Sequence, residues 1–405
     1  MNKKVALGVV LALVIGVLAG YWIASIQIAG LQAQMSSNEL EISRLRAQLS
    51  DVQDTISDIS EEITSINRML RVGNQTPHMV EPVSTVDLYR KVKDSVVLIR
   101  AVARGGENQG SGFVYDKTGH IVTNYHVVED AESIDVVFLD GSTFRASGDV
   151  RQDPYSDLAI LLIDAPPMIL KPLPLGDSSR LEVGTPVVAV GNPFGLSGTL
   201  TTGVVSQVGR SLREAVTGRY MIPNVIQIDA AINPGSSGGP LLNYDGEVIG
   251  ITTAIFSETG AFVGVGFAIP SNTVRREAPL LIAEGRYEHP FVGIEGVGLT
   301  SDLAQAMNIE TTKGLLIIRV SPGGPAEKAG LRGGTREIEV MGRVFLVGGD
   351  IIVKVDDVEV RDIDDLSAYL EENTTPGQKI SVTILRQGQE KTLQLTLGVR
   401  PPPLD

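Results

Sequence analysis

Cysteine is absent from the 405-residue chain. This absence excludes disulfides, thiolate nucleophiles, cysteine-ligated zinc and iron–sulfur clusters. Histidine is scarce, with four residues, and the formal net charge of −14 leaves no basic excess for a nucleic-acid partner. Any catalysis must therefore use an oxygen nucleophile, a histidine or carboxylates.

The rest of the composition is that of a globular protein with many turns. Apolar residues make up 43% of the chain and charged residues 20%. At roughly 150 residues per domain, this length predicts two or three domains. The chain is long enough to bury a substantial core.

One long uncharged run stands near the amino terminus, at residues 5–24. Twenty apolar residues in a helix match the thickness of a bilayer. Lys3 and Lys4 precede the run and the next basic residue is Arg44, so the positive-inside rule places the amino terminus in the cytoplasm. We expect residues 1–27 to be a membrane anchor, with a cleaved signal peptide as the alternative.

Residues 28–72 show a heptad pattern. Apolar residues alternate at steps of three and four from Ile42 to Leu70, which is typical of a coiled coil. The alternative is a single amphipathic helix packed on a globular core. Isoleucine at both seam positions from Ile56 to Ile66 favours three or four strands over two. We therefore predict a trimer, with a linker at residues 73–82.

Residues 83–285 contain short β-branched and apolar runs separated by glycine, asparagine, aspartate and proline. No helical period stands between them, so we expect antiparallel β-barrels. A stretch rich in proline and glycine at residues 171–185 divides the runs into two halves. A cleft between the halves is the expected place for chemistry. Strands are expected at residues 95–102, 110–115, 120–124, 133–138, 158–163, 186–190, 203–208, 225–228, 247–252 and 265–269.

A general base near neutral pH is most readily a histidine. His78 lies in the linker, His120 in a turn and His289 at a domain joint, and we expect all three to be solvated. His126 differs because it follows a strand directly, where a rigid element would hold its side chain at the cleft. The alternative for His126 is a core or capped histidine.

Two further residues could work with that histidine. Asp157 opens the apolar run 158–163, where a carboxylate at the mouth of a buried strand needs a partner. Its alternative is a strand cap, and its rival Asp153 precedes a proline and indicates a turn. Ser237 lies in the loop NPGSSGGP, where Gly235 would let its own N–H and that of Ser237 converge on one point. A plain glycine turn is the alternative.

The order His126, Asp157, Ser237 matches the chymotrypsin-like arrangement of a catalytic triad. The segments TNYHVVEDA, DPYSDLAILLID, AVGNPFG and DAAINPGSSGGPLLNYDGEVIGI resemble the HtrA/Deg family of trypsin-fold serine proteases. The likeness runs from about residue 83 to the carboxyl terminus. It implies a mainly β double-barrel protease followed by a PDZ domain, assembled as trimers outside the cytoplasm and acting on misfolded or exposed polypeptide.

The resemblance also implies roles for individual residues. His126 would be the general base, Asp157 its orienting partner and Ser237 the nucleophile. The loop of Gly235, Ser236 and Ser237 would form the oxyanion hole, with no metal or cofactor. The family's catalytic loop can rest in a disordered arrangement, and the candidate regulatory loops are residues 103–110, 209–223 and 254–264.

Substrate preference is expected from the residues before the nucleophile. In this fold the primary pocket is floored about six residues before the serine, at Ala231 and Ile232. Neither offers a carboxylate for lysine or arginine, so we expect a preference for small apolar residues before the cut. Asp229 is a rival floor charge that we expect to be structural.

Residues 286–400 are a separate mixed unit of strands and short helices that resembles a PDZ domain. Phe291, Val292, Gly293 and Ile294 stand in place of the carboxylate-binding loop, and their backbone N–H groups would bind peptide carboxyl termini. Residues 332–347 form an insertion between PAEKAGL and GGDIIVKVDD, and residues 401–405 a tail. A membrane-tethered PDZ chaperone in which proteolysis is secondary is the alternative function.

Overall fold

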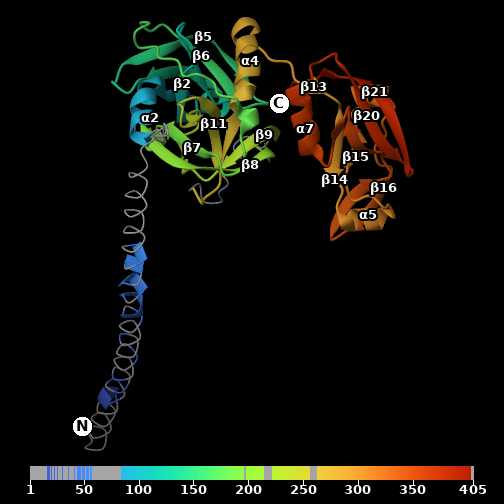
Figure 1. Cartoon of the computed structure of the whole chain (residues 1–405), viewed down its shortest axis with the longest axis horizontal. Coiled ribbons are helices and arrows are strands. Elements are labelled where there is room, and N and C mark those ends of the chain that lie inside the picture. Colours follow the sequence, from blue (N-terminus) through green and yellow to red (C-terminus); the bar gives the residue numbers. More distant parts are fainter. Residues whose placement is uncertain are drawn as a thin grey trace, which may run out of the picture. The chain divides into compact units, whose positions relative to one another are not determined.

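The computed structural model describes residues 84–195, 198–213, 221–255 and 262–402, with isolated residues between 16 and 56. The chain forms two compact units, Met1–Glu81 and Pro82–Asp405. Both barrels and the carboxyl-terminal domain belong to the second unit (Figure 1).

The described residues of the first unit are helical. Among them no helix is both long and apolar enough to cross a bilayer, and most of the expected span at residues 5–24 lies outside the described residues. The described seam residues are all more than half exposed in the single chain: Met35, Leu45, Leu49, Val52 and Ile56. The rest of the expected seam, beyond Ile56, also lies outside the described residues.

The second unit begins with a short helix and a closed six-stranded barrel. Helix α2 (Thr85–Val92) is capped by Ser84, whose hydroxyl accepts from the Val86 N–H. The barrel has the strand order β1-β2-β3-β6-β5-β4. Its elements are β1 (Val96–Ala103), β2 (Gly106–Val114), β3 (His120–Thr123), α3 (Tyr125–Val128), β4 (Ala131–Val137), β5 (Thr143–Asp153) and β6 (Leu158–Ile163).

A second closed barrel follows, with the order β10-β11-β12-β9-β8-β7. Its strands are β7 (Pro186–Gly191), β8 (Thr199–Arg213), β9 (Met221–Ile228), β10 (Pro240–Leu242), β11 (Val248–Ile255) and β12 (Gly266–Pro270). Helix α4 (Ser271–Glu284) closes this part of the chain and ends at Gly285, which adopts the left-handed conformation at φ 78°. Three short 3-10 turns are η1 (Lys93–Ser95), η2 (Ser178–Arg180) and η3 (Pro193–Gly195).

One buried cluster joins both barrels to the two helices. Phe113 and Leu158 of the first barrel pack with Val190 and Leu242 of the second, and Leu88 of α2 belongs to the same cluster. All five side chains are at most 1% exposed. The two barrels therefore share a core, which fixes the residues at their junction relative to one another.

Residues 83–285 also contain helices α2, α3 and α4, which the sequence analysis did not predict, and two strands were missed. Helices α2 and α3 are short, with eight and four residues, and α4 carries the buried residues Val274, Ala278 and Leu281 at helical spacing. Strand β5 is exposed along most of its length and β10 has three residues. Elements that bury little surface, or that are very short, leave little pattern in a sequence.

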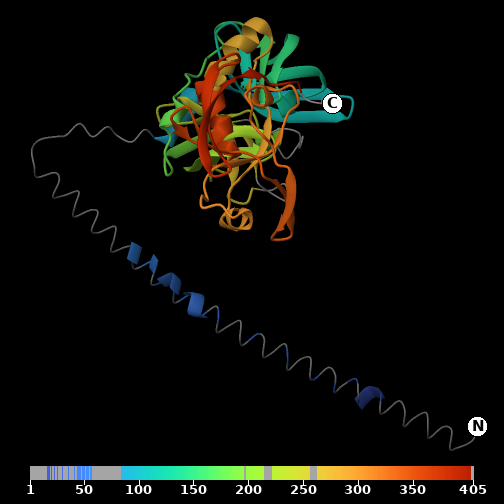
Figure 2. The ribbon, with the colours of Figure 1, turned by 90° about the vertical axis from the view of Figure 1, so that its right-hand side faces the viewer.

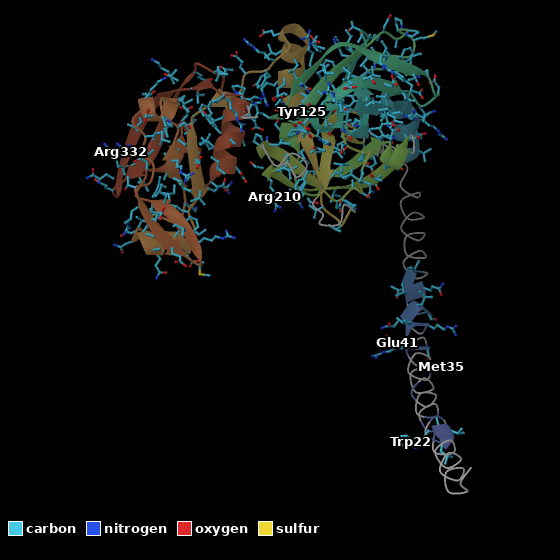
Figure 3. The ribbon with its side chains drawn as sticks, turned by 180° about the vertical axis from the view of Figure 1, so that it is seen from behind. Trp22, Met35, Glu41, Tyr125, Arg210 and Arg332 are labelled. Carbon is cyan, nitrogen blue, oxygen red and sulfur yellow. The ribbon has the colours of Figure 1, made fainter. Side chains whose placement is uncertain are left out.

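The carboxyl-terminal domain contains a sheet with the path β14-β15-β18-β20-β21, and β19 also pairs with β18. Its insertion at residues 332–347 contains the hairpin β16–β17, and Figure 3 shows Arg332 on the side of the domain away from the barrels. Figure 2 gives a second view of these strands. The elements are β13 (Pro290–Phe291), β14 (Ile294–Gly298), α5 (Ser301–Met307), β15 (Leu315–Val320), α6 (Pro325–Lys328), β16 (Arg336–Val340), β17 (Arg343–Val347), β18 (Ile351–Val355), β19 (Val358–Glu359), α7 (Ile363–Asn373), β20 (Lys379–Arg386), β21 (Gln389–Thr396) and β22 (Gly398–Val399).

Candidate active site

His126 and Asp157 are brought together by two paired strands. Strand β3 pairs with β6, and Thr123 lies opposite Ala159. His126 follows the end of β3 and Asp157 precedes the start of β6, so the pairing places them at the same edge of the barrel. His126 Nδ1 lies 2.9 Å from both Oδ1 and Oδ2 of Asp157. This contact holds the imidazole ring through Nδ1.

The Asp157 carboxylate is buried, with 2% of the residue exposed, and it is well supplied with donors. Besides the imidazole, it accepts from the His126 N–H at 3.0 Å and from Thr253 Oγ1 at 2.6 Å. The backbone of Asp157 is left-handed at φ 51°, and its carbonyl accepts from Asn124 Nδ2 and the Tyr125 N–H. Three donors fix the orientation of this buried carboxylate.

Ser237 approaches the same place from the second barrel. It lies in the loop between β9 and β10, and its hydroxyl donates to the Thr253 carbonyl at 2.8 Å. Its own carbonyl accepts from the Ser111 N–H at 2.7 Å. Thr253 of β11 therefore contacts Ser237 through its backbone and Asp157 through its side chain. The sequence analysis missed Thr253, because nothing in its local pattern distinguishes it from a neighbouring strand residue.

The glycines around Ser237 are required by close packing. At Gly238, φ is 88° and a Cβ would lie 2.0 Å from the Ser111 carbonyl oxygen. Gly235 has φ 95°, and its carbonyl accepts from Ser111 Oγ at 2.7 Å. Within the described part of the chain, neither the Gly235 nor the Ser237 N–H donates to a protein acceptor. Both amides are thus available for a ligand oxygen.

The residues expected at the primary pocket lie just before this loop. Ile232 is 3% exposed, and a Cβ on Gly266 would come within 2.9 Å of its Cγ1. Ala231 is half-buried. Asp229 is exposed, and its Oδ1 accepts from the Val204 N–H at 2.6 Å, which is the structural role expected for it.

An open cleft of about 780 Å³ adjoins His126. Its lining includes Glu129, Asp130 and Glu132 on one side and residues 103–108 on the other. All of these lining residues belong to the first barrel.

The expectation that His289 is solvated was wrong. His289 is 3% exposed, with Nε2 2.6 Å from Asp153 Oδ2 and Nδ1 2.8 Å from Glu371 Oε1. Burial lowers the pKa of His289, but the bonds to the two carboxylates outweigh it and raise the pKa to about 10. Burial, with the nearby Asp153 charge, raises the pKa of Glu277 to about 8. No local pattern could reveal this cluster, because its members come from distant parts of the chain.

The other histidines stand apart from the site. His120 is partly buried and its Nδ1 lies 2.6 Å from Asp116 Oδ2, while His78 lies outside the described residues. Donor atoms of Asp153, Glu277 and His289 all lie within 4.8 Å of one another and could hold a metal ion. Both ring nitrogens of His289 already contact carboxylates, so we describe these residues as a charge cluster.

A groove with a volume of about 190 Å³ lies at the carboxyl-terminal domain, and Pro223 of β9 also lines it. The backbone of Val292 and Gly293 is held by the Ala326 and Ser321 N–H groups, each at 2.9 Å, and Gly293 has φ 81°. The α7 residues of the lining are both apolar and polar, and they include Ser367 and Glu371. The groove is lined by Phe291, Val292, Gly293, Ile294, Ile363, Leu366 and Leu370, among others.

Comparison with known proteins gives the class of the two domains. Residues 110–251 match the trypsin-like peptidase domain family and residues 290–397 the PDZ domain family. The fold and these matches define a serine endopeptidase that carries a PDZ domain.

Individual relatives narrow this class. The chain is 42% identical to the chloroplastic protease Do-like 1 of Arabidopsis thaliana, over 79% of this chain and 73% of the relative. It is 39% identical to a protein of Brucella suis named as a DegP-like periplasmic serine endoprotease, over 72% of this chain and 53% of the relative. The chain thus spans about half the length of that relative.

Solved structures agree with these relatives. The structure of the HtrA-type protease AlgW with a tripeptide is 33% identical with a TM-score of 0.65, over 79% of this chain and 98% of that one. A serine endoprotease from Yersinia pestis is 32% identical with a TM-score of 0.56, over 81% of this chain and 100% of that one. The chain belongs to the HtrA/Deg family of serine proteases.

Proposed function

We propose that the protein cleaves misfolded or exposed polypeptides through a triad of His126, Asp157 and Ser237. The observation that carries the proposal is the position of Thr253. Its Oγ1 donates to the Asp157 carboxylate, its carbonyl accepts from Ser237 Oγ, and Asp157 in turn contacts His126 Nδ1. This chain of contacts supports the proposal that the three residues act together in acyl transfer.

The reaction begins when the Ser237 hydroxyl turns from the Thr253 carbonyl toward His126 Nε2. His126 takes the proton as Ser237 Oγ attacks the peptide carbonyl, and the Asp157 carboxylate stabilises the imidazolium that forms. The N–H groups of Gly235 and Ser237, in the loop that includes Ser236, bind the oxyanion. The imidazolium gives its proton to the leaving amine, and water then hydrolyses the acyl-enzyme.

Two further sites would select the substrate. Ala231 and Ile232 would form an apolar primary pocket that prefers small apolar residues before the cut, with modest discrimination. The PDZ groove would bind the carboxyl terminus of a peptide at the backbone of residues 291–294, with its apolar side chain against α7. The structure similar to this chain that contains a tripeptide supports peptide binding in the family.

We also propose an extracytoplasmic trimer anchored by residues 1–27 and acting in protein quality control. The names of the relatives, periplasmic in one case and chloroplastic in another, support an extracytoplasmic location. The uncharged run at residues 5–24 supports the anchor. The exposed seam residues Leu45, Leu49 and Ile56 support assembly, because isolated apolar seams on a helix need partners.

The test is proteolysis of unfolded casein by the full chain and by two neighbouring serine variants. Ser237→Ala should lower the rate by several orders of magnitude, because triad members act as a unit. Ser236→Ala is the matched control, because it keeps the backbone N–H groups of the loop and removes a hydroxyl that accepts a 3.2 Å bond from the Asn233 N–H. Cleavage by Ser237→Ala at the parent's rate would refute the proposal.

A further inference from the structure

The turn that carries Asp157 is held by residues from outside the first barrel. Asp153, at the end of β5, contacts His289 Nε2 at 2.6 Å. Within the turn, the Tyr155 hydroxyl donates to the Pro401 carbonyl. Ser156 Oγ donates to Glu277 Oε1 of α4 at 2.9 Å. Each of the three residues is thus bound by a different segment. Asp153 is bound by the link between the domains, Tyr155 by the chain that follows β22, and Ser156 by α4.

These contacts converge on a buried cluster of charge. His289 bridges Asp153 to Glu371 of α7, and both of its contacts are shorter than 2.9 Å. Arg276 Nη2 lies 2.9 Å from Glu277 Oε1 and 3.8 Å from Glu371 Oε2. Because isolated charges are costly to bury, removing one member leaves others unpaired and displaces the groups around it.

Aromatic rings packed around His289 also link the turn before Asp157 to the residues next to the PDZ domain. Tyr155 and Tyr287 meet the imidazole edge to face, with ring centroids at 5.3 and 4.7 Å. The Arg400 guanidinium lies 3.9 Å from the centre of the Tyr155 ring. Residues just before and just after the PDZ domain therefore hold the turn through both polar and aromatic contacts.

Asp157 is sensitive to the position of this turn. Its φ of 51° is unfavourable for a non-glycine residue and persists only where the surroundings enforce it. Its carboxylate sets the orientation of His126, and displacements near 1 Å in a catalytic constellation can cost on the order of 100-fold in rate.

We infer that His289, Glu277 and Glu371 are positioning residues that hold the turn before Asp157, so that the PDZ domain is part of the scaffold of the triad. The inference rests on the proposed function. It assigns to the domain junction a role in catalysis that does not depend on a peptide in the PDZ groove.

The experiment compares three variants of the full chain with the parent on a fluorogenic peptide. His289→Gln breaks the bridge between Asp153 and Glu371, and Glu371→Gln removes one charge while keeping the shape of the side chain. Glu372→Gln is the matched control, because Glu372 contacts Asn224 across the same junction and, among the described residues, forms no hydrogen bond with Asp153, Tyr155 or Ser156. Fluorophosphonate labelling counts the active sites, and thermal unfolding shows that each variant is folded.

We expect kcat per active site to fall about tenfold in His289→Gln and Glu371→Gln, with KM unchanged. The acid limb of the kcat/KM profile should move to lower pH, because a displaced Asp157 stabilises the His126 imidazolium less. Glu372→Gln should behave as the parent.

Parent-like kcat and acid limb in both cluster variants would overturn the inference, and so would an equal loss in Glu372→Gln. A merely structural role would lower the thermal midpoint without moving the acid limb, which also contradicts it. Peptide hydrolysis by parent protein without label on Ser237 would instead contradict the proposed triad.

Discussion

Replacing Thr253 by valine would remove one of three donors to the buried Asp157 carboxylate and leave the shape of the side chain almost unchanged. The bond it removes is short, 2.6 Å from Oγ1 to Oδ2. The carbonyl of Thr253, which accepts from Ser237, stays in place because it is a backbone group. The substitution therefore separates the support of Asp157 from the position of Ser237.

The expected loss in kcat/KM follows from the charge of the acceptor, the Asp157 carboxylate. A hydrogen bond to a charged group contributes about 1.5–3 kcal/mol. If this hydrogen bond stabilises the transition state, in which the imidazolium forms, its loss should lower kcat/KM about 10- to 100-fold. Thr253→Ser keeps the hydroxyl and should retain most of the activity.

The assay is the pH profile of kcat/KM on a fluorogenic peptide, with thermal unfolding of each variant as the check on folding. A folded Thr253→Val protein with parent kcat/KM would refute the reasoning, because Asp157 would then not need its third donor. A loss of the same size in Thr253→Ser would refute it as well.

Two further predictions concern stability and assembly. The pKa of His289 is about 10, above its ordinary value of 6.5, so its contribution to stability is complete below about pH 6.5 and is lost as pH rises through 10. Between pH 6.5 and 10, the thermal midpoint of the parent should thus fall by several degrees more than that of His289→Gln. An equal fall in both proteins would contradict the stabilising role of His289. Leu49→Asp should dissociate the proposed trimer in analytical ultracentrifugation, whereas Ser50→Asp should not; a trimer in both would exclude the proposed seam.

The fold was predictable where strands are buried and apolar. Strand β6 (Leu158–Ile163) has the expected bounds, because five of its six residues are buried and form a continuous apolar run. Strand β5 was missed because most of its residues are exposed. Sequence patterns report burial, so elements that bury little are hard to predict.

Some residues of the candidate site could likewise be predicted from the sequence, and others could not. His126, Asp157 and Ser237 could be proposed because each stands at a recognisable junction of strand and turn. Thr253 and His289 could not, because their partners are distant in the sequence and only the tertiary fold brings them together. His289 in particular was expected in solvent, since a residue before proline at a domain joint gives no sign of two buried carboxylates.

The most direct test of the account is fluorophosphonate labelling of the purified protein, followed by mass-spectrometric mapping of the modified residue. The account predicts a single modification on Ser237 that is lost in His126→Ala, because the hydroxyl then has no base. Labelling of another residue, or labelling of Ser237 that persists undiminished without His126, would contradict it.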